Sequence, residues 1–406
     1  MSPVDPSPGS PTIAIVGSGP SGCYTAQFLR KKWHGAEIVV FDRLSTPYGL
    51  VRYGVAPDHL GTKAVTKQFD RLFERDGVQF AGSVEVGRDI TLEALREAFD
   101  IVVLATGLSA DRPLGEGAGA APSALATTAL TGVYGAGTLT RLINGHPDET
   151  ADAVALGSRV TIVGHGNVAI DLVRLLLTPR ADLLALGVAP EVADVLGAGP
   201  VTSIEVVGRS AVEVAKFDVA MVRELAKSPD VRFEAEGLDL PVSEGIGDPA
   251  RRSAVDELVA GSPADAGRTV RFRFGWTPDH VTGEGSVGGI VFTSADGQGR
   301  TLSLETDSVC TAIGFTEAST AAVRRAEHEG PGADIERGLL DDGLFVVGWL
   351  RRGPQGTIPA NRADSKMVAD TIVGEVDDER LPLGKPGWSA VEAALLDPSA
   401  SVPTLI

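Results

Sequence analysis

The chain has 406 residues, enough for two or three domains that each bury a full core. Hydrophobic residues make up 43% and charged residues 22%, which excludes disorder along the whole chain. The formal net charge of −18 disfavours nucleic acid and anionic membrane surfaces as partners, because both would repel so acidic a protein. With 49 Gly against 13 Phe, 4 Trp and 4 Tyr, the composition favours α/β layers joined by tight strand-to-helix turns.

Cys23 and Cys310 are the two cysteines of the chain, too few to ligate zinc or an iron–sulfur cluster, and they form no CxxC redox pair. We therefore expect no metal site, and redox chemistry would need a bound organic cofactor. No apolar run approaches the ~18 residues that span a bilayer, and the opening MSPVDPSPGSP lacks the features of a secretory signal. These observations predict a cytoplasmic protein without membrane insertion.

The first part of the chain predicts one βαβ unit after a flexible tail at residues 1–11. From Thr12 an apolar strand leads into a glycine turn and a helix start, and Glu37–Asp42 reads as a second buried strand. A third strand is expected at 100–106, ending at Gly107. Between the last two strands, apolar residues on one face predict an amphipathic helix, at Val65, Phe69, Leu72 and Phe73.

The middle of the chain repeats this pattern after a Gly-, Ala- and Pro-rich crossover at 108–157. An apolar strand at 159–163 precedes a second glycine turn, and a further strand is expected at 203–209. Residues 239–267 are polar and read as an irregular excursion, with strands following at 269–274, 289–293 and 308–315. The chain is expected to return there to the first domain, and the part after Asp377 shows little pattern.

The first glycine turn, Gly17-Ser18-Gly19-Pro20-Ser21-Gly22, matches GxGxxG in the context of a dinucleotide site. Gly17 permits the turn, Gly19 lets backbone N–H groups approach a pyrophosphate, and Gly22 allows close helix packing. Asp42 stands at the end of the next strand and could accept hydrogen bonds from a ribose. The alternatives are a glycine turn without a ligand and an Asp42 that merely caps a loop.

The second turn, Gly164-His165-Gly166-Asn167-Val168-Ala169, replaces the last glycine by alanine, which the fingerprint tolerates. His165 could contact a nucleotide or be an exposed loop residue, and Asp171 reads as structural. The next strand ends in Gly208-Arg209 without an acid, so Arg209 could pair with the 2′-phosphate of NADP. Two such turns predict one tightly held flavin and one exchanging nicotinamide nucleotide.

These patterns predict an α/β fold of two Rossmann-like three-layer dinucleotide-binding domains, with the NADP domain inserted in the FAD domain. The expected FAD-binding domain consists of residues 12–107 and 316–406, the latter including a C-terminal tail. The expected NADP-binding domain is 108–315.

Three sequence blocks resemble one family, the adrenodoxin reductase type of ferredoxin–NADP reductase. They are GSGPSG, then YGLVRYGVAPDH at 48–59, and VGWLRRGPQGTIPANRADS at 347–365, with GHGNVAID between them. The last two blocks are long and uncommon. The resemblance covers most of residues 12–375 and fades at 228–340.

The resemblance implies the residues that contact each cofactor. FAD would be contacted at the first glycine turn, including Pro20, and at Ser21, Asp42, Leu50, Val86, Gly107, Trp349, Gly356, Thr357 and Ile358. NADP would be contacted at His165, Gly166, Asn167, Val168, Arg209, Ser210 and Gly356. Where the family has a second Arg this chain has Ser210, and where it has a nucleotide-contacting Glu this chain has Met221. Weaker preference for NADPH, and use of NAD, are therefore expected.

His59 and Glu224 match family residues near the flavin and nicotinamide rings, where they would orient the rings and tune polarity. Their alternatives are a turn residue and a solvated helix residue beside Arg223. The implied activity is that of a ferredoxin–NADP reductase passing electrons from NADPH to FAD and then singly to a ferredoxin, which in turn could serve a cytochrome P450 or other oxygenase. Two arginine pairs, Arg351–Arg352 and Arg324–Arg325, are candidates for docking an acidic ferredoxin.

Two rival functions stay open at this stage. One is an NADH- or dual-specific flavin reductase or monooxygenase acting on a small molecule, and the other is a non-catalytic flavoprotein. Disulfide reductase chemistry is disfavoured by the missing cysteine pair.

Overall fold

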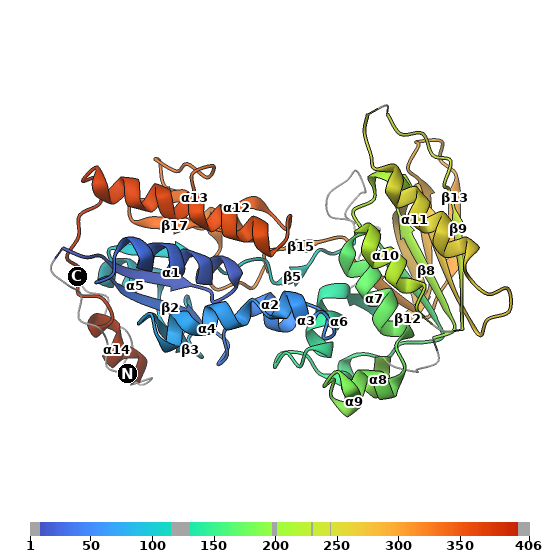
Figure 1. Cartoon of the computed structure of the whole chain (residues 1–406), viewed down its shortest axis with the longest axis horizontal. Coiled ribbons are helices and arrows are strands. Elements are labelled where there is room, and N and C mark those ends of the chain that lie inside the picture. Colours follow the sequence, from blue (N-terminus) through green and yellow to red (C-terminus); the bar gives the residue numbers. More distant parts are fainter. Residues whose placement is uncertain (1–8, 115–129, 197–200, 229, 244, 397–406) are drawn as a thin grey trace. The chain divides into compact units, whose positions relative to one another are not determined.

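The computed structural model describes residues 9–114, 130–196, 201–228, 230–243 and 245–396 (Figure 1). These residues pack as two compact units. Unit 1 contains the described residues within Met1–Val55, His59–Ala110 and Phe315–Ile406, and unit 2 those within Ala56–Asp58 and Asp111–Gly314. The predicted flexible tail lies mostly outside the described residues, and Pro11 at its end is buried.

Unit 1 is built on a six-stranded sheet in the order β16-β17-β4-β1-β2-β3, parallel except for the pair β16–β17. Its strands are β1 (Thr12–Val16), β2 (Glu37–Asp42), β3 (Gln79–Gly82), β4 (Ile101–Leu104), β16 (Leu339–Asp341) and β17 (Leu344–Val346). Its helices are α1 (Pro20–Lys32), α2 (Gly49–Tyr53), α3 (Leu60–Lys63), α4 (Thr66–Glu74), α5 (Leu92–Ala98), α12 (Trp349–Arg352), α13 (Ile358–Asp377) and α14 (Ser389–Leu396), with a 3₁₀ turn at Arg325–His328.

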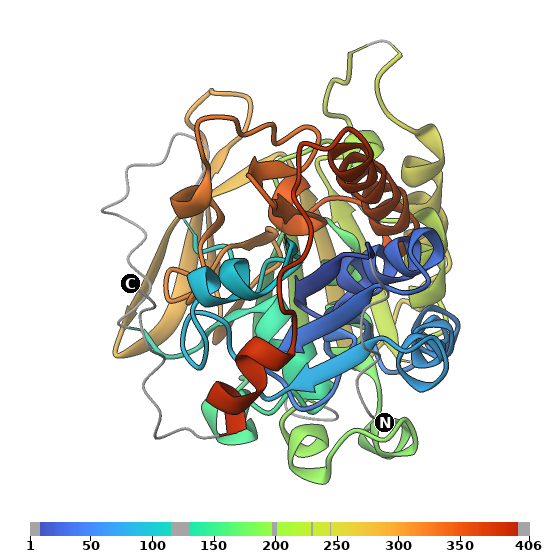
Figure 2. The same cartoon turned by 90° about the vertical axis from the view of Figure 1, so that its left-hand side faces the viewer.

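Alternating side chains of these strands pack on two helical layers. Ile13 and Ile15 of β1 belong to a core with α1, α4 and α13, whereas Ala14 and Val16 belong to a core on the side of α5 and α14. Figure 2 shows the sheet of unit 1 between these two sets of helices. Because successive side chains of a strand point to opposite faces, the near-continuous apolar strands require both layers. The predicted three-layer arrangement is confirmed for this unit.

The C-terminal segment binds the sheet of unit 1 at the end opposite the glycine turn. The carboxylate of Asp100, which is 1% exposed, accepts hydrogen bonds from the backbone N–H groups of Thr12, Gly384 and Lys385, each at 2.9 Å. The Trp388 N–H donates to Glu37 at 2.9 Å. Thr12 and Glu37 begin their strands, so the segment lies at the amino ends. The helix α14 found here was not predicted.

Unit 2 is built on a six-stranded, fully parallel sheet in the order β6-β14-β7-β8-β10-β9. Its strands are β6 (Val133–Gly135), β7 (Arg159–Val163), β8 (Ser203–Gly208), β9 (Val231–Glu236), β10 (Arg268–Phe274) and β14 (Ser308–Thr311). Its helices are α6 (Ala136–Ile143), α7 (Asn167–Leu177), α8 (Arg180–Ala185), α9 (Pro190–Leu196), α10 (Val219–Leu225) and α11 (Pro249–Ala260), with 3₁₀ turns at Ala151–Ala153 and Val212–Val214.

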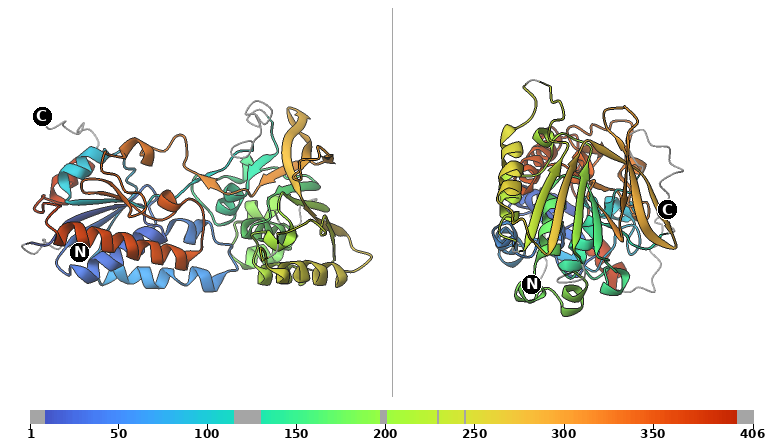
Figure 3. Two further views of the ribbon diagram at one scale, coloured as in Figure 1. Left: turned by 90° about the horizontal axis from the view of Figure 1, so that it is seen from above. Right: turned by 90° about the vertical axis from the view of Figure 1, so that its right-hand side faces the viewer.

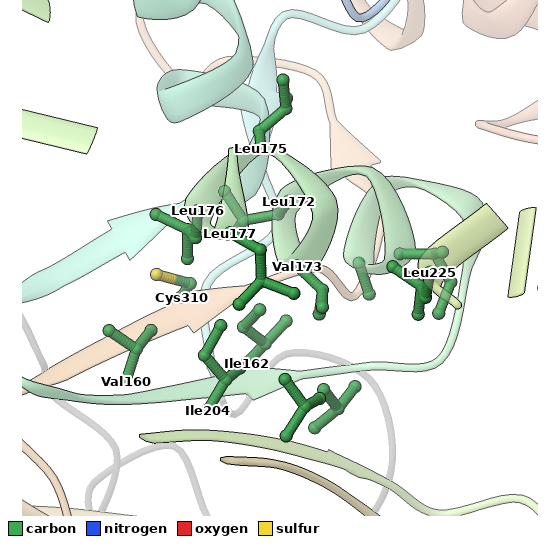
Figure 4. Packing of buried hydrophobic residues seen from close by; sticks show 14 of the residues in the cluster. Val160, Ile162, Leu172, Val173, Leu175, Leu176, Leu177, Ile204, Leu225 and Cys310 are labelled. Carbon is green, nitrogen blue, oxygen red and sulfur yellow. The ribbon is translucent and has the colours of Figure 1, made fainter. Parts of the chain in front are cut away.

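The two faces of this sheet are covered differently. On one face α7 packs Leu172, Leu176 and neighbouring side chains onto Ile162 and Ile204 (Figure 4). The other face is covered by an antiparallel sheet, shown beside the parallel strands in Figure 3, which consists of β11 (Trp276–Glu284), β12 (Ser286–Ser294) and β13 (Thr301–Glu305). The third layer of unit 2 is therefore a β-sheet, where a Rossmann-like fold would place helices.

The predicted irregular excursion at 239–267 is wrong in part, because it contains helix α11. Asp248 caps this helix by accepting the N–H of Ala250 at 3.0 Å, and Ala254, Val255 and Leu258 are buried in the core. Asp248-Pro249 is a typical helix start, but the many Gly and Pro residues around it led the sequence analysis to predict an irregular segment. The chain passes between the two units at 55/56, 58/59, 110/111 and 314/315. The crossing at 110/111 lies in β5 (Ala110–Asp111), and the one at 314/315 directly precedes its partner strand β15 (Phe315–Thr316).

Candidate functional site

The first glycine turn has the geometry that its sequence predicts. Gly17 follows β1 with φ +109°, and a Cβ there would lie 2.5 Å from the carbonyl oxygen of Ala105. A Cβ on Gly22 would lie 2.0 Å from the oxygen of Gly17. In contrast, a Cβ on Gly19 would meet no atom within 4 Å. Gly17 and Gly22 are thus required by packing, whereas the space beside Gly19 is open for a ligand.

Helix α1 begins directly at this open space. Gly19 is its N-cap, Pro20 is in its first turn, and neither a capping side chain nor an acid satisfies its first N–H groups. Such an N-terminus carries partial positive charge and exposed donors, which suit a pyrophosphate. The loop therefore has the properties of a nucleotide cradle.

Asp42 lies at the end of β2 and is oriented by Ser18, a residue that the sequence analysis did not single out. One carboxylate oxygen of Asp42 accepts hydrogen bonds from the backbone N–H and the hydroxyl of Ser18. The other accepts the N–H of Leu44 at 2.9 Å. Asp42 therefore does cap its own loop, but an ionised carboxylate has about four acceptor sites, so capacity for a ribose remains.

The block YGLVRYGVAPDH packs against the first glycine turn. Tyr48 adopts φ 93° and donates its N–H to the oxygen of Ser18 at 3.1 Å. A Cβ on the next residue, Gly49, would lie 3.2 Å from the Cα of Gly19. The structure thus brings Leu50, in the first turn of α2, to the side of the glycine turn.

The last block closes on the same turn from α13. A Cβ on Gly348 would lie 2.2 Å from the hydroxyl oxygen of Ser21, and the hydroxyl of Ser365 donates to the Ser21 carbonyl at 3.0 Å. Ser21 is 8% exposed. These contacts hold Ser21 inside the protein, so its side chain has a packing role and its contact to a cofactor stays a prediction.

Trp349 follows Gly348 and carries a polar atom without a partner. Its indole Nε1 is buried and has no hydrogen-bond acceptor among the described residues. Its ring lies 5.5 Å, between centroids, from that of Phe315. A buried indole N–H usually finds a partner, so this orphaned donor fits a cofactor acceptor.

The remaining predicted FAD residues differ in how they are placed. Gly107 has φ +67° with open space beside it, and Thr357 and Ile358 form the uncapped N-terminus of α13 with no acid in its first turn, just after Gly356. Val86 is buried among the apolar residues beside α5, so only its backbone could reach a ligand. The open cradle at Gly19, the open Gly107, and the orphaned indole together fit a bound FAD in unit 1.

The second glycine turn repeats this construction in unit 2. Gly164 follows β7 with φ +123°, and a Cβ there would lie 2.3 Å from the oxygen of Ala312. Gly166 is the N-cap of α7 and, like Gly19, has no atom within 4 Å of a Cβ position. Ala169 is fully buried, so alanine suffices at the third position. The residues Asn167 and Val168 begin α7, and the Asn167 side chain accepts the N–H of Asp218 at 2.7 Å.

His165 is buried, so the alternative of an exposed loop residue is wrong. Its ring lies 4.4 Å from that of Phe274, and its Nε2 lies 3.0 Å from the oxygen of Val206. Burial lowers its pKa to about 4, because the charged imidazolium would lose its hydration. The side chain therefore belongs to the core of unit 2, and a nucleotide could meet His165 through its backbone.

We expect His165 to make unit 2 less stable in acid. Between pH 6.5 and 4 the unfolded chain binds a proton at this imidazole that the folded chain does not, so stability falls as the pH falls through that window. In His165→Gln this part of the pH dependence should disappear. The thermal midpoint of the variant should therefore fall by a few degrees less than that of wild type when the pH is lowered through this window. Thermal unfolding at several pH values measures this. The control is His34→Gln, since His34 is exposed, and equal pH dependence of both variants would contradict the assignment.

Arg209 lies just beyond β8, exposed and without a hydrogen-bond or ion-pair partner among the described residues. Ser210 follows it and is half-buried. Met221, in α10, packs against the apolar core of unit 2. Arg209 is thus available for a phosphate, whereas neither Ser210 nor Met221 offers a second charge.

His59 and Glu224 fall in different units, His59 in unit 1 and Glu224 in unit 2. His59 is half-buried at the N-cap of α3, and its backbone oxygen accepts the N–H groups of Thr62 and Lys63. Glu224 is half-buried in α10, and its charge raises the pKa of Arg174, which burial lowers. His59 can therefore be explained as a turn residue and Glu224 as a helix residue, and their part in catalysis stays a prediction.

Arg174 forms ion pairs with two carboxylates in unit 2. It pairs with Asp58 of the second sequence block and with Asp171 at 2.6 Å. The expected structural role of Asp171 is confirmed by this ion pair.

The arginine pairs expected to dock a ferredoxin are already engaged within the chain. Arg351 and Arg352 both pair with Asp364, whose side chain is 1% exposed. Arg324 pairs with Glu327 and Arg325 with Glu329. Asp364 holds both guanidinium groups and leaves their side chains 11% and 19% exposed, but its single carboxylate offsets only one of the two positive charges, so docking at Arg351–Arg352 stays a prediction. Arg324–Arg325 keeps no net positive charge with its two acids.

The two cysteines lie in different units and are buried. Burial raises the pKa of both thiols, which for Cys310 reaches about 12. Neither is a reactive thiolate at neutral pH.

Comparisons with known proteins agree with this geometry. Residues 15–70 match the model of an NAD(P)-binding Rossmann-like domain. The chain is 46% identical over 367 residues to cindoxin reductase of Citrobacter braakii, covering 90% of this chain and 78% of that protein. It is 32% identical to the mitochondrial NADPH:adrenodoxin oxidoreductase of Mus musculus, covering 95% and 83%. The solved structure of Mycobacterium tuberculosis FprA in complex with NADPH superposes with a TM-score of 0.81 at 26% identity, covering 95% and 90%.

Proposed function

Because the chain belongs to the adrenodoxin reductase type of the ferredoxin–NADP reductase family, we propose that it transfers electrons from NADPH through bound FAD to a ferredoxin. The observation that carries this proposal is the pair of open glycine turns, at Gly19 and Gly166, each following a strand that pairs in parallel with both of its neighbours. Ligands of such sheets bind at the carboxyl ends of the strands.

The two kinds of electron carrier explain the need for a flavin. A nicotinamide gives up electrons in pairs as a hydride, whereas an iron–sulfur protein accepts them singly, and FAD supplies both kinds of transfer when bound. Within the described residues, no group of three or more His, Cys, Asp or Glu side chains could hold a metal ion. The two cysteines of the chain are too few to ligate an iron–sulfur cluster, so we propose a separate ferredoxin as the one-electron acceptor.

The residues of unit 1 would hold FAD. The N-terminus of α1 beside Gly19 would bind the pyrophosphate, and Asp42, oriented by Ser18, would accept from the ribose. Trp349 would donate its free indole N–H, and the uncapped N-terminus of α13 at Thr357 would face an electron-rich group. Enclosing the cofactor in this way fixes its position and excludes water.

The residues of unit 2 would hold NADPH. The N-terminus of α7 at Gly166 would bind its pyrophosphate, and Arg209 its 2′-phosphate. We propose that His59 and Glu224 orient the reacting rings and tune their polarity, because hydride transfer itself requires no proton relay.

The ferredoxin could pass its electrons on to a cytochrome P450 or another oxygenase, and we propose the cytoplasm as the site of this reaction. In the described part of the chain, no helix combines the length and apolar character needed to cross a membrane.

A spectroscopic assay tests the proposed function. Purified protein should be yellow, and anaerobic NADPH should bleach the flavin absorbance. Cytochrome c added afterwards should be reduced rapidly when a ferredoxin is present and slowly without it. A non-catalytic flavoprotein would bleach slowly or not at all, and a small-molecule reductase or monooxygenase would consume NADPH with its substrate and without ferredoxin. Either result would overturn the proposal.

A further inference from the structure

The imidazole of His165 joins the second glycine turn to the neighbouring strand β8. Its Nε2 lies 3.0 Å from the carbonyl oxygen of Val206. Because a carbonyl oxygen only accepts, Nε2 carries the proton, and the other ring nitrogen, Nδ1, is an acceptor in the neutral ring. Nδ1 is buried and has no hydrogen-bond partner among the described residues. The ring is therefore held by the bond to Val206 and by packing.

Gly208, the last residue of β8, provides the room for this ring. A Cβ on Gly208 would lie 2.6 Å from Nδ1 of His165, and the three nearest atoms to it all belong to this imidazole. The φ of Gly208 lies outside the left-handed region, so its backbone does not itself demand glycine. Phe274, which pairs with Gly208 at the end of β10, packs against the same ring. The glycine at this position is thus needed by the imidazole.

Main-chain contact between the second glycine turn and β8 ends just before this point. The last hydrogen bond runs from the N–H of Gly164 to the oxygen of Val207, at 2.7 Å. At the next residue of β8, the contact is made by the ring of His165 against Gly208. The distance between the turn and Arg209, which follows directly, therefore depends on a side chain.

Arg209 depends on this placement because its own side chain is held by nothing else. The side chain is exposed and has no hydrogen-bond or ion-pair partner among the described residues. A guanidinium binds a phosphate through a planar fork of donors, whose geometry must match that of the ligand. A displacement of about 1 Å in a positioning group can cost about a hundredfold in rate. The backbone position of Arg209 thus decides whether its fork meets a 2′-phosphate.

We propose that His165 is a positioning residue, which holds Arg209 at the distance from the second glycine turn that favours NADPH over NADH. This role rests on the proposed function of unit 2. The imidazole acts through Gly208 and Arg209, and its own contacts are to β8 and Phe274. The preference between the two nucleotides is therefore set in part by a buried ring behind the arginine.

The test is the ratio of kcat/KM for NADPH over NADH, measured in the FAD-containing protein with one ferredoxin and one acceptor. His165→Ala should lower this ratio by about tenfold, mainly through a higher KM for NADPH. His165→Gln should keep most of the preference, because its amide N–H can donate to the Val206 carbonyl. Lost packing alone would lower both efficiencies by the same factor. An unchanged ratio in His165→Ala would therefore overturn the inference.

A second variant tests the same contact while keeping the ring. Gly208→Ala places a methyl group 2.6 Å from Nδ1 of His165, so the two must move apart, and the ratio should fall by about tenfold. In the double variant with His165→Ala, the methyl group has no ring to displace. The ratio should then equal that of His165→Ala alone. If the two effects multiplied instead, the residues would act independently and the inference would be wrong.

Leu258→Ala is the matched control, because Leu258 is a buried residue of α11 in the same core. It should lower the thermal midpoint and leave the ratio at its wild-type value. Arg209→Ala separates the inference from the proposed function. If Arg209→Ala lowers the ratio but neither His165→Ala nor Gly208→Ala does, the inference alone falls. If Arg209→Ala also leaves the ratio unchanged, the proposed binding of the 2′-phosphate falls with it.

Discussion

Gly19→Val is expected to give a protein that folds but does not retain FAD. A Cβ at Gly19 meets no protein atom within 4 Å, and its φ of −65° suits any residue, so the apoprotein should tolerate the change. The added side chain would occupy the space where backbone N–H groups approach the pyrophosphate. Losing two such charge-assisted contacts costs about 4 kcal/mol, or about a thousandfold in affinity. FAD affinity of the apoprotein, by flavin fluorescence quenching, and its thermal midpoint measure the two effects.

Two further variants separate cofactor loss from misfolding. Gly17→Val should destabilise the protein with or without FAD, because its φ is +109° and its Cβ would overlap the Ala105 carbonyl. Gly61→Val, in the exposed helix α3 and also with open space, should keep FAD. If purified Gly19→Val contained stoichiometric FAD, the proposed pyrophosphate site beside Gly19 would be refuted.

The second large effect concerns the choice between NADPH and NADH. Arg209→Ala should lower the ratio of kcat/KM for NADPH over NADH by about tenfold to a hundredfold, because one charge-assisted contact contributes about 1.5 to 3 kcal/mol. Ser210→Arg should raise the ratio by a comparable factor, since a second guanidinium beside Arg209 would complete a phosphate clamp. The ratio is measured in both variants with one ferredoxin and one acceptor.

The matched control for this pair is Arg300→Ala, since Arg300 is an exposed arginine that pairs with Asp296 after β12. Its ratio should equal that of wild type. If Ser210→Arg left the ratio unchanged, the account of the altered phosphate clamp would be wrong. If Arg209→Ala changed NADH and NADPH equally, Arg209 would contact a shared part of the nucleotide.

Local patterns were sufficient for the elements that form the cradles. The apolar runs predicted β1, β2, β7 and β8, and the glycines after β1 and β7 predicted both strand-to-helix turns. Helix α11 was missed because its two starting residues stand in a Gly- and Pro-rich stretch. Helix α14 was missed because the contacts that hold its segment come from Asp100 and Glu37, which are remote in sequence.

The site residues also fall into two groups, those that the local sequence identifies and those whose role depends on contacts with distant residues. Gly19 and Gly166 could be identified from the motif because the turn itself demands them. The burial of His165 depends on Phe274, and the engagement of Arg351 depends on Asp364, so neither could be read from the neighbouring residues. Ser18 carried no sequence signal, because its importance comes from its contact to Asp42.

The sequence by itself determined the βαβ units, the two glycine turns and the family, because strand periodicity and turn geometry are set by residues a few positions apart. Only the tertiary structure decided which charges are neutralised and which stay available, since pairing depends on residues that folding brings together from distant parts of the chain. That is why Arg351 and Arg352, prominent in the sequence, are held by Asp364, whereas Arg209 remains available for a ligand.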